Sequence, residues 1–152
     1  TTAGYLLPLA YFKKNDIIDY RTYLKEIYFT GTHEDAIYDV LNKKADIGAA
    51  KNTVFDRLAQ SDDRIRKELS ILFISPDVPE NCLALKMTVD VMVRKKIKDV
   101  LLQMERDAEG AMVLKSFGAK RFIVTKDEDY APVFKYASDI GLNLATYDYL
   151  NN

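Results

Sequence analysis

Cysteine and histidine are almost absent from this sequence of 152 residues, which contains one of each. A single cysteine, Cys82, excludes an internal disulfide and leaves the redox compartment open. With His33 as the only histidine, the sequence has no cluster of Cys and His ligands with the spacing of a metal site. We therefore expect no metal site, and the sequence predicts no cofactor.

Long hydrophobic runs and an excess of either charge are also missing. No apolar run approaches the roughly 20 residues of a membrane-spanning helix. The net charge of −1, without a basic stripe, argues against a nucleic-acid partner. With 48% hydrophobic and 30% charged residues, the composition is typical of a globular protein with a hydrophobic core.

The chain opens on a helix start, Thr1-Thr2-Ala3-Gly4-Tyr5-Leu6-Leu7-Pro8. Such a start directs backbone N–H groups, hydroxyl donors and the positive dipole end to one point, which suits a phosphate-like anion. The simpler alternative is that Thr2 only caps the helix. Because the ring of Pro8 would meet the carbonyl of Gly4, we expect an irregular first turn and a regular helix from Leu6 or Leu7.

A second helix start is predicted at Thr32, with Asp35 three residues later and an apolar helical face over residues 36–41. His33 lies in the first turn, where the helix dipole disfavours an imidazolium unless an anion lies alongside. We expect His33 either to be neutral or to have an anionic neighbour. The alternative is an exposed histidine at a helix start without a role.

Short apolar segments that alternate with helices predict an α/β fold. The expected strands are residues 27–29, 45–50, 69–74 and 82–85. Asn52 or Thr53 is expected to cap a helix that runs through Leu58. The two prolines of residues 75–81 indicate a linker.

The second half of the chain is predicted to be mainly helical. Thr88 is expected to cap a long helix with an apolar face that reaches Met104. Further helices are expected from Glu109 to Phe117, where Gly118 stops the helix, and from about residue 127. The chain begins without the strand that normally precedes a helix of this kind, so we expect an N-terminal part to lie outside this sequence.

In this order, the segments resemble the substrate-binding proteins of phosphate, phosphite and phosphonate ABC transporters, which have the type II periplasmic binding fold. The resemblance covers nearly the whole chain. It rests on the first eight residues and on Thr30-Gly31-Thr32-His33 with the helix that follows. Further similar segments occur in family order at residues 45–49, 75–79, 109–115 and 129–133.

The resemblance implies a three-layer α/β lobe of the type II periplasmic-binding kind with a mainly helical C-terminal return segment. Residues 1–75 would form the second, anion-binding lobe. Residues 76–152 would form the hinge crossover and C-terminal helices, which would pack on a first lobe missing from this chain. Since Val93, Ile97 and Leu101 would then be exposed or packed against another chain, we expect self-association of this fragment.

The function implied is that of the solute-binding component of an ABC transporter. Closure of two lobes would capture phosphate, phosphite or an alkylphosphonate, and the closed form would dock on the membrane permease, with no bond made or broken. The location implied is periplasmic or extracytoplasmic, including the form of a membrane-anchored lipoprotein. The alternative is the extracytoplasmic sensing domain of a receptor. An anion-using enzyme is disfavoured, because the sequence has neither GxGxxG nor a phosphate-loop lysine motif.

The resemblance also implies a set of ligand-binding residues. Relatives that bind aminoalkylphosphonates have acidic residues for the ammonium group, and the matching positions here are Thr53 and Asn81. Neither can supply a negative charge, so an ammonium group would be left unpaired and we expect a ligand without an amine. Lys51 adds a positive charge nearby, unless it is only a surface lysine at a strand end. The residues expected to hold or line the ligand are Thr1, Thr2, Ala3, Gly4, His33, Lys51, Thr53 and Asn81.

Overall fold

A wide helical turn precedes the first regular helix. In the computed structural model, which describes residues 2–146, Thr2–Leu6 form a π-helical turn (η1) and the chain continues as α1, Leu7–Lys14. Pro8 lies in the first turn of α1, and the wider turn η1 before it accommodates the proline ring and its missing N–H group. The prediction of an irregular first turn is therefore confirmed.

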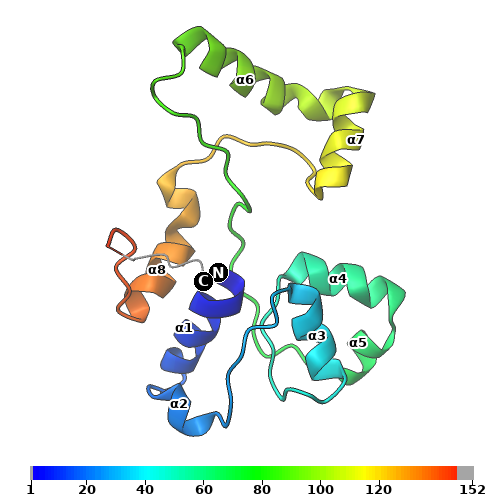
Figure 1. Ribbon diagram of the computed structural model, residues 1–152, viewed down its shortest axis with the longest axis vertical. Helices are drawn as coiled ribbons and strands as arrows, with labels where there is room; N and C mark the ends of the chain where they lie inside the picture. Colours follow the sequence, from blue (N-terminus) through cyan, green and yellow to red (C-terminus); the bar gives the residue numbers. More distant parts are fainter. Residues whose placement is uncertain (1, 147–152) are drawn as a thin grey trace. The chain divides into compact units, whose positions relative to one another are not determined.

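The other helices follow along the chain as Figure 1 shows. Two of them, α2 and α5, were not predicted, because at four and five residues they are too short to show a helical period. The helical elements after α1 are α2 Tyr20–Tyr23, α3 His33–Leu41, α4 Asn52–Ser61, α5 Arg64–Glu68, α6 Val91–Gln103, η2 Met104–Arg106, α7 Ala108–Phe117, η3 Asp127–Tyr130 and α8 Ala131–Asp139.

Two of the predicted helix caps are wrong. The carboxylate of Asp90, not the hydroxyl of Thr88, caps α6, and it accepts hydrogen bonds from two backbone N–H groups at 2.9 and 3.2 Å. An ionised acceptor binds such groups more strongly than a hydroxyl does. At α4 the N-cap is Lys51, and Asn52 and Thr53 already lie inside the helix. The predicted stop of α7 at Gly118 is confirmed by its left-handed φ of 77°.

The predicted strands do not form within residues 2–146. Residues 27–29, 45–50, 69–74 and 82–85 run between helices with no assigned strand in the described chain. Several of their apolar side chains are exposed, Phe29 by 74% and Leu72 by 64%. A strand needs a neighbouring strand for its backbone groups, and the described segments do not pair with one another. The three-layer α/β arrangement predicted for this lobe is therefore not observed in the described residues.

A hydrophobic core joins α3, α4 and α5, which lie together in Figure 1. Its buried side chains are Ile37 and Leu41 of α3, Leu58 and Ala59 of α4, and Ile65 of α5. Burial of each large aliphatic side chain contributes about 1.5–3 kcal/mol relative to exposure. This cluster fixes the position of α3 relative to α4 within the unit that contains them.

Residues 45–50 pack against α3 through a glycine. A Cβ atom at Gly48 would lie 2.8 Å from Cγ2 of Val40 and 3.0 Å from the carbonyl oxygen of Ala36. Only a residue without a side chain lets the two backbones approach this closely. The segment predicted to be a strand therefore covers one side of α3, although it is not a strand.

The chain divides into two compact units, which we describe separately. The first runs to Val78 and includes the chain again from Ala131, and the second is Pro79–Tyr130. Within the first unit, α1 contacts α8. Within the second, α7 packs on η2. The predicted assignment of residues 1–75 and 76–152 to two lobes of a larger protein stays a prediction, because the units show only how this chain packs on itself.

The long helix of the second unit has little contact with the rest of its unit. No residue of α6, all of which the structure describes, is buried. Val93 is 48% exposed, while Ile97 and Leu101 are half-buried. The exposure predicted for Val93 is confirmed, and the predicted self-association stays a prediction. Among residues 2–146, no helix is both long and apolar enough to cross a membrane.

Candidate functional site

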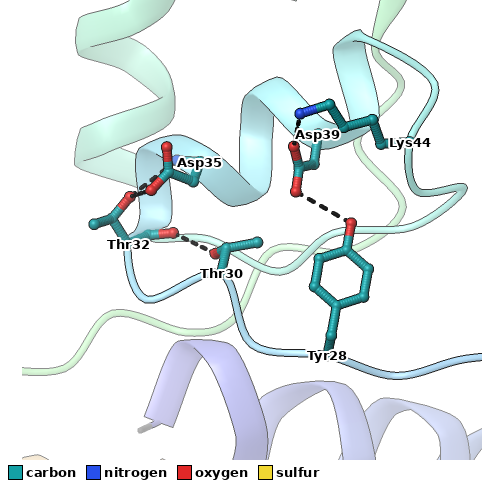
Figure 2. A network of polar contacts seen from close by, with 6 residues as sticks. All are labelled: Tyr28, Thr30, Thr32, Asp35, Asp39 and Lys44. Atoms are coloured by element: carbon teal, nitrogen blue, oxygen red, sulfur yellow. Dashed lines mark hydrogen bonds and ion pairs between the residues drawn. The ribbon is translucent and has the colours of Figure 1, made fainter.

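A network of hydroxyl groups defines the start of α3 (Figure 2). Oγ1 of Thr32 accepts a hydrogen bond from the backbone N–H of Asp35 at 3.0 Å and donates one to its carboxylate at 2.7 Å. The hydroxyl of Thr30 donates to the carbonyl oxygen of Thr32 at 2.8 Å. The predicted cap is confirmed, and these bonds place His33 as the first residue of α3.

A tyrosine attaches the preceding segment to the side of α3. The hydroxyl of Tyr28 donates to Oδ2 of Asp39 at 3.1 Å, and Nζ of Lys44 lies 3.2 Å from the other carboxylate oxygen (Figure 2). Partial desolvation and this hydrogen bond raise the pKa of Tyr28. The hydroxyl therefore remains protonated at neutral pH and keeps donating to Asp39.

An aromatic contact links η1 to the loop that precedes α3. The rings of Tyr5, in η1, and Phe29, three residues before Thr32, have their centroids 6.4 Å apart. Aromatic pairs at this separation contribute about 0.5–1.5 kcal/mol beyond the area they bury. The contact brings the Thr2–Gly4 turn and the loop that leads into α3 into one region of the first unit.

The predicted ligand-binding residues of these two helix starts are accessible. Thr2 is exposed, whereas Ala3, Gly4 and His33 are partly buried. Thr1 lies outside the described residues. A hydroxyl, backbone amides and an imidazole are groups that donate hydrogen bonds to an oxyanion. That these residues bind an anion stays a prediction.

Two carboxylates in the first turn of α3, those of Glu34 and Asp35, would repel an anion bound there. Asp35 is occupied by the Thr32 hydroxyl, and Oε2 of Glu34 lies 2.9 Å from Nη2 of Arg57 in α4. The guanidinium group offsets the charge of Glu34 beside His33. Sequence reasoning missed this pair, because its members are 23 residues apart on different helices and no local pattern links them.

The other predicted site residues have different positions. Lys51 is the half-buried N-cap of α4, and Thr53 is exposed in the first turn of that helix. Since α4 packs on α3, both belong to the unit that contains His33. Asn81 is exposed and belongs to the second unit. The structure therefore does not unite Asn81 with the other predicted residues within one unit.

Metal ligands do not gather anywhere in the described part of the chain. No group of three or more His, Cys, Asp or Glu side chains among residues 2–146 could hold a metal ion. The chemistry available at the two helix starts is hydrogen bonding and charge, from hydroxyl, amide and imidazole donors. Such groups suit reversible binding of a small anion.

Comparison with known proteins agrees with this chemistry. The family described as "ABC transporter, phosphonate, periplasmic substrate-binding protein" matches residues 1–130. Over 138 residues the chain is 27% identical to the phosphonates-binding periplasmic protein of Escherichia coli strain K12. That alignment covers 90% of this chain and 40% of the relative, so the chain spans less than half the relative's length. No solved structure was found to match the chain. The resemblance that the sequence motifs predicted is confirmed.

Proposed function

The chain belongs to the family of periplasmic substrate-binding proteins of phosphonate ABC transporters, and on this premise we propose that it forms the oxyanion-binding part of a solute-binding protein. The observation that carries the proposal is the family match over residues 1–130, which includes both helix starts. The family is a class of transporter components that bind a solute, not a class of enzymes. The location proposed from the family is extracytoplasmic.

The proposed ligand lies where the two helix starts meet. Thr2, the backbone of Ala3 and Gly4, and His33 would hold the oxyanion, with Thr1 adding a second hydroxyl. The contact between Tyr5 and Phe29 supports this placement, because it keeps the two starts together. A hydrogen bond to a charged group contributes roughly 1.5–3 kcal/mol, so three or four of them can give micromolar binding after the cost of ordering.

The proposed ligand is a small phosphorus oxyanion without an amine, such as phosphate, phosphite or an alkylphosphonate. Thr53 has no negative charge with which to balance an ammonium group. Desolvation of an unpaired ammonium would oppose binding. Two lobes would close over the anion, and the closed form would dock on a membrane permease.

Titration calorimetry on the full-length protein tests this proposal. We expect Thr2→Ala and His33→Ala each to weaken binding of methylphosphonate by about tenfold or more, since each removes a hydrogen bond to a charged ligand. Thr22→Ala is the control, because the hydroxyl of Thr22 in α2 donates to the carbonyl oxygen of Asp19, the N-cap of that helix, and belongs to neither of the two proposed anion-binding helix starts. Unchanged affinity in both variants, or tightest binding of 2-aminoethylphosphonate among the ligands tried, would contradict the proposal.

A further inference from the structure

We infer that the ion pair between Glu34 and Arg57 sets the charge selectivity of the oxyanion site. The inference rests on the proposed function, and it concerns which oxyanions the site prefers. Neither residue belongs to the two helix-start motifs. The pair acts on the ligand through its charge and requires no direct contact with it.

The position of the pair is set by the packing of two helices. Glu34 follows His33 directly in the first turn of α3, and Arg57 lies in the second turn of α4. Their side chains approach to 2.9 Å and are 45% and 62% exposed. Since the buried side chains of α3 and α4 fix the two backbones, the guanidinium group is held near this end of α3.

The charge of Glu34 matters because of its distance from the proposed ligand. Glu34 and His33 are adjacent residues with Cα atoms about 3.8 Å apart, so we expect the charge of Glu34 to act on a ligand at His33 over a distance comparable to the roughly 8 Å screening length of physiological salt. An unpaired carboxylate there would repel an oxyanion. Asp35 is the other acidic residue of this turn, and its carboxylate accepts a hydrogen bond from Thr32. Of these two acidic residues, Glu34 is the one that pairs with a cation from a neighbouring helix.

The pair therefore removes a negative charge that an aminophosphonate could use. With Arg57 in place, the net charge contributed by the pair is zero, and ligands without an amine are favoured. Without Arg57, Glu34 would attract the ammonium group of an aminoalkylphosphonate and repel a simple oxyanion. The same carboxylate would then supply the negative charge that Thr53 lacks.

The test measures a ratio of affinities. Titration calorimetry on the full-length protein compares methylphosphonate with 2-aminoethylphosphonate for the wild type, Arg57→Gln, Glu34→Gln and the double variant. Arg57→Gln is expected to weaken methylphosphonate binding about two- to fivefold, the effect of one unit charge roughly 8 Å away at a protein surface once physiological salt screens it, and to shift the ratio toward the amine. Glu34→Gln is expected to shift the ratio the opposite way, and the double variant to restore it.

A second ion pair of the same type is the matched control. Nη2 of Arg66 lies 3.0 Å from Oδ1 of Asp56, with side chains 57% and 58% exposed, and this pair joins α4 to α5 rather than to the first turn of α3. We expect Arg66→Gln to leave the ratio unchanged. A ratio in Arg57→Gln equal to that in Arg66→Gln would overturn the inference. Binding of neither ligand by the wild type would instead overturn the proposed function.

Folding is checked separately. Arg57→Lys keeps the positive charge and is expected to keep the wild-type ratio, so it separates charge from shape if Arg57→Gln folds poorly. A ratio that shifts equally in Arg57→Lys and Arg57→Gln would assign the effect to packing and overturn the inference.

Discussion

Two regions of the molecule contain helices with apolar side chains but differ in how those side chains pack. One region is the group of helices α3, α4 and α5, and the other is the second unit, Pro79–Tyr130. The helices share five buried side chains, and Ile65 is completely buried. Of the described residues 79–130, only Gly110 and Leu114 are buried, and α6 contributes neither. Apolar sequence alone therefore does not make a core, because the apolar side chains also need partners within reach.

The difference bears on where binding can occur. A binding site needs its donors held in place by rigid elements. The start of α3, with His33 and the pair of Glu34 and Arg57, lies on the helices that share the core. The helix α6 of the second unit instead has no buried residue and presents exposed apolar side chains such as Met92 and Val100. This difference favours the first unit for the proposed oxyanion site, and we expect α6 to depend on contacts with other polypeptide.

Truncation of a buried side chain in the core of α3, α4 and α5 should have the largest effect on the free energy of unfolding. Ile65→Ala should lower the free energy of unfolding by about 2–5 kcal/mol, because it leaves a cavity among α3, α4 and α5. Val100→Ala, at a side chain 56% exposed in α6, should change it by less than about 0.5 kcal/mol. Urea denaturation of the full-length protein measures both. Equal losses in the two variants would show that the second unit is packed as well as the first.

Substitution of one glycine in each region, Gly48 beside α3 and Gly110 in α7, should have an intermediate effect on stability and tests how closely each region is packed. A Cβ atom at Gly110 would collide with the backbone oxygen of Met104, and one at Gly48 would press on Val40 and Ala36. Each alanine variant should lower the free energy of unfolding by about 1–3 kcal/mol. Hydrogen exchange should show a local loss of protection, at α7 for Gly110→Ala and at α3 for Gly48→Ala. Gly31→Ala shows the effect of a strained φ without any collision.

The two variants Gly48→Ala and Gly110→Ala would also show how far the loss of hydrogen-exchange protection extends from each substitution. In the region with a core, a strained contact should weaken protection across α3, α4 and α5 together, because they share buried side chains. In the second unit the loss should stay within α7 and η2. Loss of protection that reaches α6 in Gly110→Ala would contradict the view that this unit has only a local core.

The smallest expected effect comes from an exposed ion pair between α4 and α5. Arg64 donates two side-chain hydrogen bonds to Asp62, at 3.0 and 2.6 Å, and these lower the pKa of the Asp62 carboxyl group. A lowered pKa in the folded state means that the stabilising contribution is present above the ordinary aspartate pKa and is lost as the pH falls through the lowered value. NMR titration of the Asp62 carboxyl carbon should show this pKa, and Arg64→Gln should return it toward normal. A titration unchanged by Arg64→Gln would exclude the pair as the cause.

Local interactions explain what could be predicted from the sequence. The cap at Thr32, the stop at Gly118 and the irregular turn before Pro8 each depend on residues within about one helical turn, so their patterns are visible in the printed sequence. The two anion-type helix starts and the family follow from the same local motifs. The wrongly predicted caps, Thr88 for α6 and Asn52 or Thr53 for α4, show the limit of this approach, because several neighbouring residues could have capped each helix.

Interactions between distant residues were decided only by the tertiary structure. The residues predicted as strands have suitable side chains, but a strand forms only with a partner, and the described chain places none beside them. The contact of Tyr5 with Phe29 and the pairing of Glu34 with Arg57 join residues 24 and 23 positions apart. The sequence by itself determined the family and the local helix starts, whereas the tertiary structure decided the contact of η1 with the loop before α3 and the cation that lies beside Glu34. The physical reason is that caps and turns act within a few residues, while packing and charge pairing depend on distances that the chain reaches only after it folds.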